Sequence, residues 1–199
     1  EPLSNLDANL RSQMRAELAA RHQELGVTTV YVTHDQVEAM TLADRIVLLR
    51  GGRIEQFDTP EGCFERPRTA YVASFFGQPP ATLLSASLHG DHVRVGSTSL
   101  PLDVPLVRDT GDVIIGLRSH ALQPATGGPI AMRVSEREYT GAELRLHGHI
   151  EGHDEAKHSV TVGADQVAIG RGERLELVAA RAAVLGAVRQ GAHDAVGCF

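Results

Sequence analysis

The stretch VTTVYVTHD, residues 27–35, decides how this sequence is interpreted. Its first seven residues are all β-branched or aromatic, which is typical of a strand buried on both faces of a sheet. His34 follows at once, and Asp35 together with Glu38 predicts a capped start for a short helix to about Ala43. Functional side chains of open α/β sheets gather just beyond the carboxyl ends of strands. There His34 could donate to a phosphate oxygen or a water, although a helix-entry residue bonded to local backbone explains it equally well on this signal alone.

The sequence on either side alternates predicted helices and strands. Upstream, Asp7 predicts the N-cap of a helix over residues 8–25, which Gly26 ends. Downstream, two apolar strands at 45–50 and 53–57 are joined by a glycine pair, as in a hairpin. Two short helices follow, the first opened by Thr59 and Pro60 and the second covering about residues 70–76. This alternation predicts an α/β fold with a parallel sheet.

The pattern changes at Gln78-Pro79-Pro80. Beyond it, short alternating runs are separated by Gly, Asp and Pro, which predicts a small antiparallel barrel or sandwich. The clearest runs cover residues 92–95, 112–117, 130–134, 143–150, 159–162 and 174–178. We therefore expect a first domain at 1–78, a second at 79–180 and an uncertain tail at 181–199. The Ala/Gly-rich end fits at best a helix with a frayed terminus.

Composition excludes several classes of function. A net charge of -6 argues against nucleic acid as the partner. No run approaches the length of a membrane-spanning helix, and two cysteines do not make a disulfide framework. Lys157 is the sole lysine and has no glycine before it, so the chain contains no phosphate-binding P-loop. Because the chain begins with Glu1 and not Met, we expect a piece of a larger protein.

Three segments together resemble a known family. They are EPLSNLD at residues 1–7, VYVTHDQVEAMTLADRIVLLRGGRIEQ at residues 30–56, and the Thr59-Pro60 pair. They are similar to the ATP-binding subunits of bacterial ABC importers, above all the branch that serves maltose, trehalose, related sugars and glycerol 3-phosphate. The resemblance runs almost continuously to about Leu84.

The resemblance implies roles for individual residues. Glu1 matches the general base that polarises the attacking water, and His34 matches the switch histidine that contacts the γ-phosphate. The D-loop, which crosses the interface between two ATPase subunits, corresponds to Ser4, Asn5, Leu6 and Asp7. The P-loop, Q-loop, signature motif and Walker B aspartate would all lie upstream of Glu1. We therefore expect ATP and Mg²⁺ to act in the complete protein, and this chain alone neither to bind ATP tightly nor to hydrolyse it; no metal site of its own is expected.

The second half resembles the regulatory OB-like barrel at the C-terminus of the same ATPases. Residues 116–122, GLRSHAL, are similar to the family segment GIRPEHL, but Ser119 and His120 replace its Pro-Glu. Residues 170–177 resemble a closing strand of that barrel. In the family this domain dimerises and senses regulators, and these contacts do not transfer residue by residue.

The implied partners are a second ATPase subunit, transmembrane permease subunits and, indirectly, a substrate-binding protein, at the cytoplasmic face of the bacterial inner membrane. The transported substrate stays open, since polyamine, iron and sulfate importers share much of this ATPase. One alternative is a non-catalytic regulatory or ligand-binding module, with the barrel as the working part. A nucleic-acid-binding OB-fold fits poorly, because aromatic residues beyond the boundary are limited to Tyr139 and Phe199.

Two other groups of residues are candidate sites. Four histidines, His147, His149, His153 and His158, are close enough in sequence to suggest a metal site, but solvated strand and loop histidines are favoured. Arg11, Arg15 and Arg21 could form a basic patch. Acidic residues on the same helix favour a mixed, solvated face instead.

Overall fold

The computed structural model describes residues 3, 6–95, 98–101, 110–153, 157–166, 168–179 and 184–188. The chain forms two compact units, Glu1–Cys63 and Phe64–Phe199. It is mostly β, and every pairing between described strands is antiparallel. Among those residues no helix has the length and apolar character needed to cross a bilayer. The compact division does not test where an ATPase domain ends, so a boundary between residues 78 and 79 stays a prediction.

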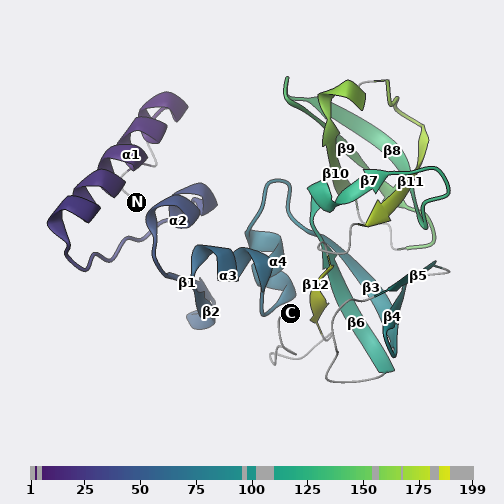
Figure 1. Cartoon of the computed structure of the whole chain (residues 1–199), viewed down its shortest axis with the longest axis horizontal. Coiled ribbons are helices and arrows are strands. Elements are labelled where there is room, and N and C mark those ends of the chain that lie inside the picture. Colours follow the sequence, from purple (N-terminus) through teal and green to yellow (C-terminus); the bar gives the residue numbers. More distant parts are fainter. Residues whose placement is uncertain are drawn as a thin grey trace. The chain divides into compact units, whose positions relative to one another are not determined.

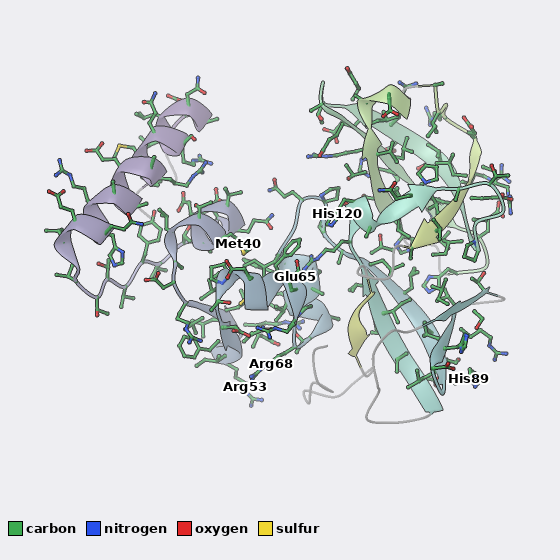
Figure 2. All side chains as sticks on the ribbon, in the orientation of Figure 1. Met40, Arg53, Glu65, Arg68, His89 and His120 are labelled. Carbon is green, nitrogen blue, oxygen red and sulfur yellow. The ribbon has the colours of Figure 1, made fainter. Side chains whose placement is uncertain are left out.

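The first helix, α1 (Ala8–Leu25), has the predicted bounds. The Asp7 side chain accepts from the backbone N–H of Leu10 at 2.9 Å, and Gly26 ends the helix in the left-handed region with φ 61°. Side chains project from it on all sides, and none of its residues is buried (Figure 2). The apolar residues of α1 are therefore at most half-buried.

The hairpin that follows is also as predicted. Strand β1 (Ile46–Arg50) pairs with β2 (Arg53–Asp58), and Gly51 and Gly52 both adopt the positive φ that a two-residue turn needs. One face buries Ile46, Leu48 and the polar Gln56. The opposite face leaves four large apolar side chains exposed: Val47, Leu49, Ile54 and Phe57. One face of the hairpin is thus an exposed apolar surface.

The predicted strand at residues 27–33 is not formed, and this prediction was wrong for the chain as it stands. Val30 is 90% exposed and Val32 is 70% exposed, so the face that carries them is uncovered, while Tyr31 and Thr33 on the other face are half-buried. A strand needs a neighbour that pairs with its backbone N–H and C=O groups. No described strand pairs with this segment, and the predicted parallel sheet is likewise not formed by the described residues.

Phe64–Phe199 is built on two five-stranded sheets that share one hydrophobic core (Figure 1). One sheet has the order β12-β6-β3-β4-β5 and the other β10-β9-β8-β11-β7. The strands are β3 (Thr82–His89), β4 (His92–Val95), β5 (Thr98–Pro101), β6 (Thr110–Leu117), β7 (Leu122–Pro124), β8 (Ile130–Tyr139), β9 (Glu143–Ile150), β10 (His158–Gly163), β11 (Arg174–Ala179) and β12 (Val184–Val188). Helix α3 (Pro60–Glu65) begins in the first unit and ends in the second. The second unit also contains α4 (Ala70–Phe75) and the short 3-10 turns η1 (Ser119–Ala121) and η2 (Ala164–Gln166).

The second sheet fits the predicted OB-like barrel. Its two edge strands, β10 and β7, pack against each other, so that it is nearly closed. The six predicted runs all fall within observed strands. The expectation of a helix near the C-terminus is wrong for Val184–Val188, which is a strand paired with β6 (Figure 1). These residues form a strand because the open edge of β6 supplies partners for their backbone N–H and C=O groups.

A buried arginine fixes α4 to this unit. The guanidinium of Arg118 donates to the backbone oxygens of Phe64 at 2.6 Å, of Ala73 at 2.9 Å and of Phe76, and it lies 4.0 Å from the centroid of the Phe64 ring. Burial lowers the pKa of Arg118 to about 10, which leaves it charged at neutral pH. Gly77, with φ 117°, passes so close that a Cβ there would lie 3.0 Å from an Arg118 nitrogen.

Replacing this arginine is expected to destabilise the unit. Arg118→Met removes the donors to buried carbonyl oxygens and should lower the free energy of unfolding by at least about 2 kcal/mol. Arg118→Lys should recover little, because one ammonium group cannot reach carbonyls that a planar fork spans. Arg94→Met, on the exposed side of β4, is the matched control. Urea unfolding followed by circular dichroism measures all three, and equal midpoints would contradict the prediction.

Candidate functional site

The structure describes half of the predicted site residues. Glu1, Ser4 and Asn5 lie outside the described residues, and Leu6, Asp7 and His34 lie within them. Leu6 is the last residue before the α1 cap, and its backbone N–H donates to the oxygen of the buried Leu3 at 3.2 Å. Asp7 caps α1. The carboxylate of Asp7 therefore serves as the N-cap of α1.

His34 is exposed in the turn that immediately precedes α2 (Gln36–Leu42). The next residue, Asp35, caps that helix: its Oδ1 accepts from the N–H groups of Val37 at 2.7 Å and Glu38 at 3.2 Å. The Thr33 hydroxyl in turn accepts from the N–H of Asp35 at 3.0 Å. The residues on both sides of the imidazole are thus fixed by hydrogen bonds.

A buried carboxylate holds the segment that leads to His34. Glu38 is 3% exposed, and its Oε2 accepts from the hydroxyls of Thr33 at 2.7 Å and Tyr31 at 3.0 Å. Tyr31 and Thr33 lie on one side of the extended segment, three residues and one residue before His34. Glu38 thereby secures this segment to α2, although no strand pairs with its backbone.

The capping box was only half correct as a prediction. Asp35 caps α2 as expected, whereas the Glu38 side chain accepts from Thr33 and Tyr31. Sequence reasoning could have found this arrangement from the hydroxyl pair at positions 31 and 33, since alternate residues of an extended segment share a face. The expected solvated face was wrong for Arg11, whose side chain is 30% exposed and contacts both Leu6 and Asp35.

The chemistry available here is that of one phosphate contact. An exposed imidazole next to the start of a helix can donate to a phosphate oxygen. A magnesium ion prefers several oxygen ligands, and no group of three or more His, Cys, Asp or Glu side chains in the described ranges could hold a metal ion. The exposed His34 imidazole could contact a phosphate group, and the described residues include no cluster that could hold a metal ion.

The other candidate groups take part in local structure. His147 bonds the Ser159 hydroxyl at 2.8 Å and lies 3.8 Å from a Glu138 oxygen. His158 is buried, so the expectation of four solvated histidines was wrong for it; β10 carries its ring into the interior, 5.9 Å from that of His153. Arg21 bonds Glu24 on the exposed side of α1, as a mixed face predicts.

Removing the buried carboxylate should release the segment that carries His34. Glu38→Ala leaves the hydroxyls of Tyr31 and Thr33 without their acceptor and should lower the stability of the Glu1–Cys63 unit by about 2 kcal/mol. Amide hydrogen exchange should rise across residues 31–38. Glu17→Ala, on the exposed face of α1, is the control and should change neither quantity. Unchanged exchange in Glu38→Ala would show that the carboxylate does not hold the segment.

Comparison with known proteins gives consistent relatives. An sn-glycerol-3-phosphate import ATP-binding protein of Jannaschia is 47% identical over 155 residues, covering 76% of this chain and 44% of that protein. One from Ruegeria pomeroyi is 48% identical over 157 residues, covering 77% and 43%. A sulfoquinovosyl glycerol transport ATP-binding protein of Agrobacterium fabrum is 46% identical over 155 residues, covering 74% and 43%. No family profile matches the chain. The chain spans under half the length of these relatives.

Proposed function

Since the chain belongs with the ATP-binding subunits of bacterial sugar and glycerol-3-phosphate importers, we propose that it supplies the hydrolytic residues of such a subunit's ATPase site. The observation that carries the proposal is the fixed turn at His34: an exposed imidazole whose neighbours on both sides are hydrogen-bonded. Such preorganisation suits phosphoryl transfer, in which positioning and electrostatics matter more than covalent chemistry.

In this proposal each residue has a distinct task. His34 donates to the γ-phosphate of ATP, and Glu1 accepts a proton from the attacking water. The residues Ser4 to Asp7 face a second ATPase subunit. Mg²⁺, when bound in the complete subunit, neutralises charge on the phosphates. The P-loop, Q-loop, signature motif and Walker B aspartate come from the rest of the subunit, so the isolated chain is inactive.

The proposed setting is an importer. Two copies of the complete subunit bind the permease subunits at the cytoplasmic face of the membrane and hydrolyse ATP there. A binding protein delivers the substrate to the permease. The names of the relatives favour glycerol 3-phosphate or a glycosyl glycerol as cargo. Carbohydrates in general stay within the proposal, because nothing in an ATPase site recognises the cargo.

The exposed apolar segment supports a larger ATPase domain. Residues 27–33 carry valines that water surrounds, and the β1–β2 hairpin has an apolar outer face. We propose that the remaining part of the ATPase domain pairs with residues 27–33 as a strand of a parallel sheet. It would also cover the apolar outer face of the β1–β2 hairpin. Burying one valine stabilises a fold by roughly 1.5–3 kcal/mol, which is enough to favour docking strongly over exposure.

The alternative function is a regulatory or ligand-binding module without catalysis. The hydrophobic core of the Phe64–Phe199 unit favours it, because the described buried residues of this core, from Leu84 to Leu177, all belong to that unit. Activity separates the two functions. Only the first requires that the complete subunit release phosphate from ATP.

Phosphate release tests the proposal. The complete subunit should hydrolyse ATP, whereas the isolated chain should not. In the complete subunit, His34→Ala should lower kcat about 10²-fold, as the loss of one preorganised donor does in other enzymes. His120→Ala, an exposed histidine on η1 (Figure 2), is the control. Turnover by the isolated chain, or full activity of His34→Ala, would contradict the proposal.

A substitution at Val30 tests the docking of residues 27–33. Val30→Asp should leave the stability of the isolated chain unchanged, because that side chain is 90% exposed there. In the complete subunit the same change places a carboxylate inside a sheet and should lower the melting temperature by several degrees. Equal melting temperatures for both complete subunits would show that the segment stays exposed.

A further inference from the structure

We infer that Arg11 is a positioning residue that couples the loop ending at Asp7 to the turn that carries His34. The inference rests on the proposed function, which gives these two segments their roles. Arg11 lies in the first turn of α1, where its backbone N–H donates to the oxygen of Asp7 at 2.9 Å. Its side chain leaves α1 and reaches acceptors in two different segments, at Leu6 and at Asp35.

The guanidinium joins those segments directly. Nη2 of Arg11 donates to the backbone oxygen of Leu6 at 3.0 Å, and Nη1 lies 3.6 Å from Oδ2 of Asp35. The side chains of Arg11 and Asp35 are 30% and 24% exposed, so water screens the pair only in part. A planar guanidinium holds its two terminal nitrogens in a fixed relation, which a lysine ammonium cannot do.

Asp35 has two functions at once. Its Oδ1 caps α2 through the N–H groups of Val37 and Glu38, and its Oδ2 faces Arg11. A displacement of Leu6 therefore acts through one guanidinium group on the carboxylate that follows His34. Glu38 on α2 holds the residues before His34. The residue after it, Asp35, is held in part by Arg11 on α1.

A second arginine on α1 shows why this contact differs from an ordinary surface ion pair. Arg21 and Glu24 lie within one helix, and their side chains are 65% and 68% exposed. Such pairs contribute little and connect nothing beyond their own helix. Arg11 instead connects Leu6 and Asp35, which are far apart in sequence and lie on either side of α1 along the chain. We therefore expect its loss to disturb two segments together.

Hydrogen exchange on the chain tests the coupling without any assay of ATP. Arg11→Gln should raise deuterium uptake at least about two-fold both near Leu6 and across the start of α2, residues 35–38. Asp35→Asn should do the same, because asparagine keeps the cap but loses the charge facing Arg11. The double variant should be no worse than either single variant. Arg21→Gln is the matched control. Unchanged uptake at either segment in Arg11→Gln would overturn the coupling.

Kinetics in the complete subunit test its functional meaning. Arg11→Gln should lower kcat for ATP at least about five-fold and leave KM within two-fold, since the arginine orients His34 and does not touch the nucleotide. Arg11→Lys should restore only part of the rate. A wild-type subunit without ATPase activity would overturn the proposed function, while the exchange result would still judge the coupling. Normal kcat in Arg11→Gln would overturn the positioning role alone.

Discussion

A β-strand persists only when the N–H and C=O groups of its backbone have partners, and this constraint divides the molecule. In Phe64–Phe199 the described strands find neighbours along the same chain, and their inward side chains merge into one core. In Glu1–Cys63 the hairpin β1–β2 is self-sufficient, because a glycine turn returns the chain on itself. Residues 27–33 have a more strand-like composition than either hairpin strand, yet without a neighbour they stay extended and exposed.

Much of the secondary structure follows from local rules. The caps at Asp7 and Asp35, the stop at Gly26 and the Gly51-Gly52 turn act over a few residues, and the sequence was sufficient to place them. The errors occurred where pairing over distance decides. Val184–Val188 is a strand because β6 offers an open edge, which no local pattern in an Ala/Gly-rich stretch indicates. Residues 27–33 failed for the opposite reason: composition favoured a strand, and no described partner was at hand.

The sequence names the candidate site residues, whose roles stay predictions, but it does not show which contacts hold them. His34 and Asp7 follow from motif and position, and Asp35 from capping chemistry. The role of Glu38 could be deduced only from the spacing of Tyr31 and Thr33. The role of Arg11 could not be deduced, since its side chain bridges segments separated along the chain. A charged residue on a helix is by default solvated, and only the fold shows which one is turned inward. The contacts that hold a candidate residue in place are therefore harder to predict than the candidate itself.

The pairing of β12 with β6 makes one sheet depend on both ends of the larger unit. Strands β7 to β11, which form the whole of the other sheet, lie between them in sequence. During synthesis the sheet that contains β3 and β6 would acquire its last strand only after residue 188 has left the ribosome. Contacts of such high sequence separation slow folding, because a long loop must close before they form. The order of assembly is thus nested, with the intervening barrel available to fold first.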